Sequence, residues 1–302
     1  MKNRNWWLLL AAAILSCTLQ TEKVEDIAAD DNRFLNVAYA DASTMQQMDM
    51  FLPEGAGLFP AVLLIHGGGF ARGDKKMEYS HAKLLVENGY AAICVNYRLS
   101  GEAVFPAAVH DCKAAVRFVK ANAASYKIDA GKIGVWGSSA GGNLAAMLGT
   151  SAGDAFADGN IGKYTDLDTQ VQACVDWFGP IDFSTMVAQA KELGMRKNFN
   201  VDIESKYLGV DANAAANITI VAKANPSNYL DKNDPPFLIQ VGDADPLIPY
   251  LQSQTFSADL EKVIGKNKVS FHLLEGARHG GSLFESENNL GRVIAFLDAY
   301  LK

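Results

Sequence analysis

The chain has 302 residues, of which 49% are hydrophobic and 20% are charged. This composition is typical of a globular protein and excludes a disordered tail protein, a collagen and a coiled coil. The formal net charge is −7, so the chain lacks the basic footprint of a nucleic-acid-binding protein, and we expect no nucleic-acid partner. The length predicts one large α/β domain or two small ones.

The N-terminus has the pattern of an export signal. Lys2 and Arg4 precede an apolar run over residues 6–15, which is too short to span a bilayer but typical of a signal peptide. Residues 14–17, Ile-Leu-Ser-Cys, resemble a bacterial lipobox, in which the cysteine is lipidated. We therefore expect an exported protein held at a membrane surface by a lipid on Cys17. The alternative is ordinary cleavage and release into the periplasm or the medium.

This pattern divides the chain into three parts. We expect a signal peptide over residues 1–16, a polar and acidic tether over residues 17–33, and one folded domain over residues 34–302. Apart from Cys17, the cysteines are odd in number and have no neighbouring histidine or CxxC partner, which favours buried free thiols. They are Cys94, Cys112 and Cys174.

Strand and helix patterns alternate along the rest of the chain. Short apolar runs predict strands, and longer amphipathic segments predict helices. The expected strands are residues 48–52, 61–65, 90–95, 132–136, 171–178, 237–241 and 269–274. The expected helices are residues 78–88, a long helix that begins at Pro106, residues 143–148 and residues 288–301. This alternation predicts a mostly parallel, doubly wound sheet in a single domain.

Two stretches interrupt the alternation. Residues 151–170 are rich in glycine and aspartate, and we expect a surface loop there. Their acidic residues lack the spacing of a calcium-binding loop, so we expect no metal. Residues 184–226 are polar and helical in pattern. We expect the two stretches to form a small cap over the carboxyl edge of the sheet, where such sheets place their sites.

The clearest chemical signal is Gly-Ser-Ser-Ala-Gly at residues 137–141, which follows an expected strand and begins a helix. Only Ser139 has glycine both two residues before and two residues after it. A nucleophile on so sharp a turn requires small neighbours, and the helix N-terminus favours a developing negative charge. We therefore expect Ser139 to be a nucleophile. The alternative is a glycine-rich helix start without chemistry.

A second signal, His-Gly-Gly-Gly-Phe at residues 66–70, directly follows another expected strand. Consecutive glycines allow backbone N–H groups to approach a ligand closely, as the oxyanion of an acyl-transfer intermediate requires. We assign the N–H groups of Gly68, Gly69 and Ala140 to an oxyanion hole. The alternative is a glycine-rich turn that binds no ligand. The serine motif later in the chain disfavours this alternative.

An activated serine requires a base and a carboxylate that orients the base. His279 is the expected base, because it lies in a glycine-rich loop after the last expected strand. Asp245, in the loop after the preceding strand, is the expected acid, and Asp243 is the alternative. The chain order Ser139, Asp245, His279 is the order found in α/β-hydrolases.

Together these motifs resemble the α/β-hydrolase esterases with an HGGG oxyanion loop, and more narrowly the bacterial acetylxylan/feruloyl esterase-like group. The resemblance runs from about residue 35 to the last residue, and it is carried by residues 66–74, 137–142, 235–237, 245–249 and 276–280. It implies an α/β-hydrolase fold with a small cap or loop insertion, a Ser-His-Asp triad and an acyl-enzyme, with no cofactor. The chain departs from the family pattern at two positions: Asn143 stands where histidine is frequent, and Phe70 stands where tryptophan is frequent. Both departures bear on which acyl group the enzyme prefers.

The expected substrates are esters. Export and the lack of a long apolar lid favour acetyl or hydroxycinnamoyl esters on plant polysaccharides. Phe70, Trp177 and Phe178 are expected to line an aromatic or sugar subsite, with core packing as the alternative for Trp177. Other interpretations are a general short-chain carboxylesterase, an amide hydrolase or peptidase, and an inactive surface-binding protein. We expect membrane contact only through the lipid, and the sequence leaves the oligomeric state open.

Overall fold

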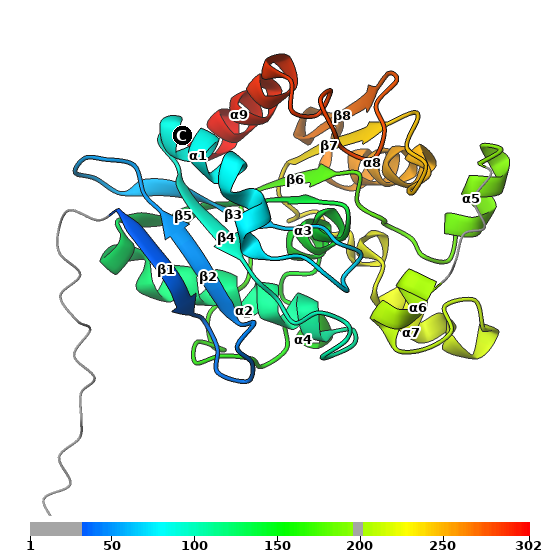
Figure 1. Cartoon of the computed structure of the whole chain (residues 1–302), viewed down its shortest axis with the longest axis horizontal. Coiled ribbons are helices and arrows are strands. Elements are labelled where there is room, and N and C mark those ends of the chain that lie inside the picture. Colours follow the sequence, from blue (N-terminus) through cyan, green and yellow to red (C-terminus); the bar gives the residue numbers. More distant parts are fainter. Residues whose placement is uncertain (1–31, 196–201) are drawn as a thin grey trace, which may run out of the picture. The chain divides into compact units, whose positions relative to one another are not determined.

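An eight-stranded sheet lies at the centre of the computed structural model, which describes residues 32–195 and 202–302 (Figure 1). The strand order is β1-β2-β4-β3-β5-β6-β7-β8. The strands are β1 Arg33–Ala38, β2 Gln47–Phe51, β3 Phe59–Ile65, β4 Ala91–Val95, β5 Ile128–Ser138, β6 Ala173–Trp177, β7 Phe237–Gly242 and β8 Val269–Leu274. The pairs β1–β2 and β2–β4 are antiparallel, and the remaining pairs are parallel.

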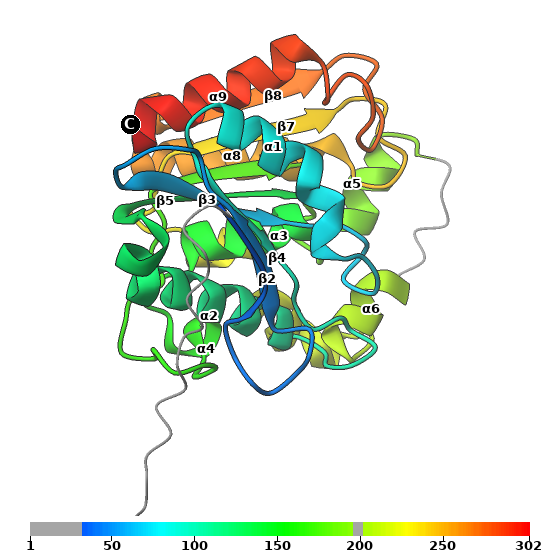
Figure 2. The same ribbon diagram turned by 60° about the vertical axis from the view of Figure 1, so that its left-hand side comes forward.

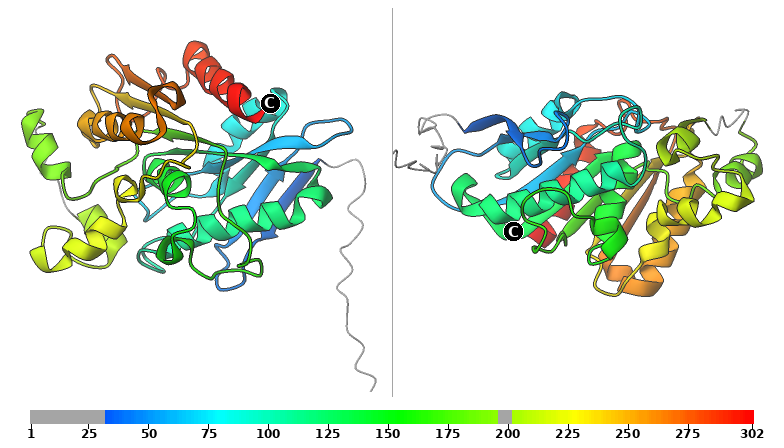
Figure 3. Two further views of the ribbon diagram at one scale, coloured as in Figure 1. Left: turned by 180° about the vertical axis from the view of Figure 1, so that it is seen from behind. Right: turned by 90° about the horizontal axis from the view of Figure 1, so that it is seen from below.

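Helices cover both faces of this sheet. They are α1 Tyr79–Glu87, α2 Ala107–Asn122, α3 Ala140–Thr150, α4 Ala155–Asp158, α5 Met186–Glu192, α6 Asp202–Leu208, α7 Ile218–Lys223, α8 Tyr250–Ile264 and α9 Glu287–Leu301. One core cluster joins the sheet to α1 and α9, and the other joins it to α2, α3 and α8 (Figures 2 and 3). No helix in the described ranges is both long enough and apolar enough to cross a bilayer.

The central strands β3 and β4 are continuous apolar runs, as expected of strands whose two faces are both buried by helices. Every residue of β4 is buried, and so are the five residues Ala61 to Ile65 of β3. Helix α3, which follows β5, is buried from end to end because it lies between the sheet and α2. The loops at the carboxyl ends of β3, β5, β7 and β8 are therefore held by a rigid scaffold.

The structure confirms the mostly parallel, doubly wound sheet, and it adds one strand. β1 begins at Arg33, the last residue of the expected tether, and pairs with β2 at the edge of the sheet. Its residues are mostly exposed, so the strand lacks the apolar run by which the inner strands were predicted. The compact unit runs from Asn32 to Lys302. The expected signal peptide, most of the tether and Cys17 lie outside the described residues.

The stretch 151–170 is more ordered than the expected surface loop. It contains α4, and Thr169 is fully buried. The fully buried ammonium group of Lys113 donates to Asp158 at 2.9 Å and to Thr169 at 3.1 Å. This buried ion pair fastens the stretch to α2, a contact between residues 45 positions apart that the local sequence does not reveal.

Three short helices, α5, α6 and α7, lie in the stretch 184–226, in keeping with its helical pattern. Figure 2 shows α5 near the carboxyl ends of β7 and β8, and α6 well below those two strands. The three cysteines Cys94, Cys112 and Cys174 are buried and free, which confirms the prediction made from their spacing.

Candidate functional site

The loops after three parallel strands bring a serine, a histidine and an aspartate into one hydrogen-bonded series. Ser139 follows β5, Asp245 follows β7 and His279 follows β8. Nε2 of His279 lies 2.8 Å from Oγ of Ser139, and Nδ1 lies 2.7 Å from Oδ2 of Asp245. Both distances are ordinary hydrogen bonds, so the imidazole can accept the serine proton while the carboxylate holds its orientation.

The backbone of Ser139 is strained, as expected of a nucleophile on a sharp turn. Its φ is 55° and its ψ is −120°, a backbone conformation that residues with a Cβ atom rarely adopt. Added Cβ atoms on Gly137 and Gly141 would collide with the carbonyl oxygens of Gly141 and Ile65, respectively. The glycines two residues before and after Ser139 are therefore required by close backbone packing.

Asp245 is held as a fully buried carboxylate. Its Oδ1 accepts hydrogen bonds from the backbone N–H groups of Leu247 at 2.7 Å and Ile248 at 3.0 Å, which leaves Oδ2 for His279. Asp243, the alternative acid, has another partner: its Oδ1 accepts from the N–H of Gly276 at 2.7 Å. The geometry therefore selects Asp245 as the partner of His279.

The glycine loop after β3 lies directly against the serine. An added Cβ on Gly67 would lie 2.9 Å from the carbonyl oxygen of Ser138 and 3.3 Å from Cβ of Ser139. Gly68 and Gly69 have φ of 119° and 62°, values that favour glycine. The N–H of Ala140 belongs to the first turn of α3, where amides have no intrahelical acceptor. Backbone donors therefore lie beside Ser139.

His66 stabilises this loop and takes no part in the hydrogen-bonded series. Its Nδ1 donates to the carbonyl oxygen of Gly67 at 2.8 Å, and its ring stacks on Tyr97 with centroids 4.4 Å apart. Burial lowers the pKa of His66, so the imidazole is neutral at neutral pH. An added Cβ on Gly73 would collide with the same Nδ1, which explains a glycine at that position.

The three aromatic residues expected to contact substrate have other roles. Trp177 is 1% exposed, and its Nε1 donates to Gln240, so it has the core-packing role given as its alternative and does not line a subsite. Phe178 packs against the imidazole of His279, with ring centroids 4.6 Å apart, and thereby orients the base. Phe70 is 2% exposed and stacks on Tyr207 beneath the glycine loop. All three side chains belong to the supporting core.

One buried carboxyl group behind Ser139 was not predicted. Asp176 is the second-last residue of β6 and is fully buried, and its Oδ1 accepts from the N–H of Gly179 at 2.9 Å. Burial raises the pKa of Asp176 to about 7. An added Cβ on Gly142 would collide with Oδ1, so the carboxyl group packs against the first turn of α3. In the sequence, Asp176 lies near the carboxyl end of a predicted strand, where such sheets place their sites, and this position could have marked it as a candidate.

A second buried histidine fastens the loop that carries His279. His81 on α1 is 8% exposed; its Nδ1 lies 2.8 Å from Glu78, and its Nε2 lies 3.2 Å from Glu285. Glu285 lies in the loop between β8 and α9. Burial by itself would lower the pKa of His81, but the hydrogen bonds and charges of Glu285 and Glu78 outweigh burial and raise it to about 9.

Glu285→Gln should lower thermal stability at neutral pH and flatten its pH dependence. Because the pKa of His81 rises from 6.5 to about 9 on folding, the stabilisation is complete below pH 6.5 and is lost as the pH rises through 9. The carboxylate of Glu285 is half exposed. We therefore expect Tm to fall by only about 1–3 °C at neutral pH.

Calorimetric scans from about pH 6 to pH 10 measure this dependence. Glu275→Gln, which neutralises an exposed carboxylate in the same connection, is the matched control. An unchanged slope of Tm against pH in Glu285→Gln would show that the pair contributes nothing.

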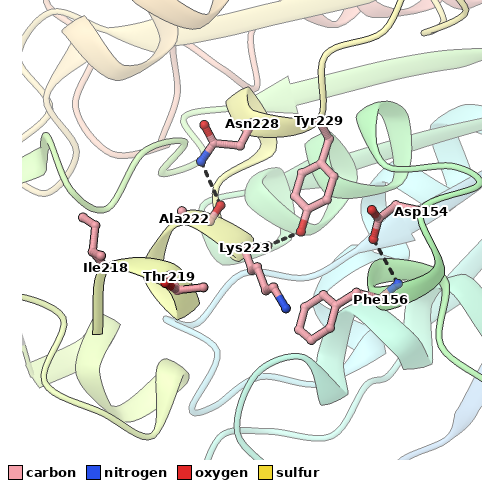
Figure 4. A pocket seen from close by; sticks show the side chains of 8 residues that line it. All are labelled: Asp154, Phe156, Ile218, Thr219, Ala222, Lys223, Asn228 and Tyr229. Carbon is pink, nitrogen blue, oxygen red and sulfur yellow. Dashed lines mark hydrogen bonds between the residues drawn. The ribbon is translucent and has the colours of Figure 1, made fainter. Parts of the chain in front are cut away.

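A surface pocket of about 450 Å³ lies apart from the serine, between α4 and α7 (Figure 4). Two of its polar side chains are hydrogen-bonded to the backbone of α7: Asn228 donates to the carbonyl oxygen of Ala222, and Tyr229 donates to that of Lys223. The ammonium group of Lys223 lies 4.0 Å from the ring centroid of Phe156. None of the residues around Ser139 lines this pocket. In the described part of the chain, no group of three His, Cys, Asp or Glu residues is arranged to hold a metal ion.

The sheet order, the strained serine between β5 and α3, and the Ser-Asp-His chain order define an α/β-hydrolase. The chain belongs to the BD-FAE family of α/β-hydrolase esterases, which residues 48–260 match.

Relatives in sequence and in structure agree with this assignment. Esterase LipQ of Mycobacterium tuberculosis is 31% identical over 226 residues, which are 74% of this chain and 51% of LipQ. A bifunctional GH43-CE protein of Bacteroides eggerthii superposes with a TM-score of 0.81 at 33% identity, covering 90% of this chain and 36% of that one. A truncated carbohydrate esterase from gut microbiota superposes with a TM-score of 0.79 at 30% identity, covering 90% and 98%. The chain thus spans about half the length of its mycobacterial relative.

Proposed function

We propose that this protein is a serine esterase that removes short acyl or hydroxycinnamoyl groups from plant polysaccharides. The observation that carries the proposal is the hydrogen-bonded series of Ser139, His279 and Asp245 beside a loop of glycine amides. The similarity to a GH43-CE protein and to a gut carbohydrate esterase supports a carbohydrate-linked ester as the substrate.

The mechanism follows from the roles of these groups. Oγ of Ser139 attacks the ester carbonyl carbon while Nε2 of His279 takes its proton, and Asp245 stabilises the imidazolium. The oxyanion accepts hydrogen bonds from the N–H groups of Gly68, Gly69 and Ala140. His279 then protonates the leaving alcohol oxygen. In the second half, His279 deprotonates a water molecule that attacks the acyl-enzyme, and Ser139 is released.

The experiment is to measure acid release from acetylated xylan and from methyl ferulate side by side, with Ser139→Ala as the control. We expect acetate, ferulate or both from the wild type and none from the variant. Cleavage of an aryl acetate without release from either substrate would contradict the polysaccharide assignment. It would favour a general short-chain carboxylesterase, the alternative that the similarity to LipQ supports.

We also propose export through the signal-like segment at residues 1–16, with Cys17 as the lipidated residue. The support is the lipobox-like sequence alone. Cys17→Ala should abolish labelling by a fatty-acid analogue and release the protein from the membrane fraction. Unchanged labelling would contradict the assignment.

A further inference from the structure

Helix α6 is fixed on the glycine loop by a buried aromatic pair. The rings of Tyr207 on α6 and Phe70 after the glycines are parallel within 12°, and their centroids lie 3.7 Å apart. Tyr207 is 1% exposed. Its carbonyl oxygen accepts a hydrogen bond of 2.7 Å from the N–H of Phe105, whose ring also packs against it. Contacts on both sides therefore hold α6 in place relative to the loop.

This anchor places Ile203 against the glycine loop. Residues four apart lie on the same face of a helix, so Ile203 is on the face that carries Tyr207. Cγ2 of Ile203 lies 3.2 Å from the position that a Cβ on Gly69 would occupy. Ile203 is nevertheless 48% exposed. An apolar side chain thus lies on the proposed oxyanion loop with about half of its surface open to solvent.

The direction of the reaction identifies which part of an ester lies near this side chain. The leaving oxygen must face Nε2 of His279 to receive its proton, and the oxyanion must face the loop amides. In the sheet, β3 lies on one side of β5, and β6, β7 and β8 lie on the other. The glycine loop and His279 therefore approach Ser139 from opposite sides. Of the two remaining bonds of the tetrahedral carbon, one directs the oxyanion to the loop amides, and the other carries the acyl substituent past the edge of the loop, the side on which Ile203 lies.

We propose that Ile203 limits the size of the acyl group that the site accepts. This inference rests on the proposed esterase function. The side chain narrows the space beside Gly69, so of the two acyl classes proposed above an acetyl group fits and a hydroxycinnamoyl group meets the isoleucine. Acetylated xylan is then the preferred of the two substrates. Ile203 is a specificity-determining residue and has no part in proton transfer.

The test is a series of kcat/KM measurements on p-nitrophenyl acetate, butyrate and hexanoate. Ile203→Ala should raise the ratio of hexanoate to acetate by about tenfold or more, because a few methylene groups in an apolar pocket discriminate by that amount. Ile203→Val should give a smaller rise, and Ile203→Trp should lower the ratio. Ile218→Ala is the matched control, because Ile218 is 59% exposed on α7 and does not contact the glycine loop.

A second series that varies the alcohol of acetate esters separates the two sides of the substrate. If the Ile203 substitutions change the selectivity for the alcohol and leave the selectivity for the acyl group unchanged, the assignment is wrong. An unchanged acyl profile in all three Ile203 variants would also overturn it. Either result leaves the esterase proposal intact if the wild type is active. No Ser139-dependent hydrolysis in the wild type would instead refute the proposed function itself. Circular dichroism of each variant verifies that it is folded.

Discussion

Ser139→Ala should lower kcat on an aryl acetate by about 10⁵- to 10⁶-fold while the protein stays folded. The serine oxygen is the atom that Nε2 of His279 reaches, at 2.8 Å, and alanine has no atom that can attack the carbonyl. The remaining activity would come from substrate binding and the loop amides, which act without the serine. Steady-state kinetics measure the effect, and circular dichroism tests the fold.

His279→Ala should cost about as much as Ser139→Ala, because a serine without its base is a weak nucleophile. The double variant should lose little more, since groups that act as one unit have strongly non-additive effects. A double variant that falls several further orders of magnitude below either single variant would contradict this account. It would mean that the two side chains contribute independently.

Asp245→Asn should lower kcat by about 10⁴-fold without unfolding the protein. The buried carboxylate accepts from Nδ1 of His279, and an amide in its place can present an N–H and favour the wrong imidazole tautomer. The backbone N–H groups of Leu247 and Ile248 hold the position of residue 245. The substitution therefore removes the charge and leaves the geometry in place.

Asp243→Asn is the matched control for this prediction. Its carboxylate is two residues away in the same loop and receives only the N–H of Gly276. An asparagine side-chain oxygen can accept the same hydrogen bond, so kcat should fall by less than about tenfold. A larger loss in Asp243→Asn than in Asp245→Asn would show that Asp243 is the acid.

Much of the sheet and the triad arrangement could be predicted because the relevant signals are local. A continuous apolar run such as that of β3 predicts a strand buried on both faces. In a parallel sheet the carboxyl ends of all strands meet at one edge, so serine, aspartate and histidine in three strand-end loops are brought together. The hydrogen bonds among Ser139, His279 and Asp245 follow from that convergence.

The features that escaped prediction depend on contacts between distant residues. The sequence left Trp177 open between a sugar subsite and the core, because the choice depends on its contact with Gln240, 63 residues away. Ile203 has no local signal, because its role depends on α6 packing onto a loop more than 130 residues earlier. Exposed β1 was missed because an edge strand carries little apolar patterning.

In the proposed mechanism, Ser139 is an activated nucleophile. The most direct measurement is mass-spectrometric mapping of the adduct formed by a fluorophosphonate probe. We predict a single adduct on the peptide that contains Ser139, its loss in Ser139→Ala, and strongly slowed labelling in His279→Ala. Folded wild-type protein that stays unlabelled, or that carries the adduct on another residue, would contradict the account.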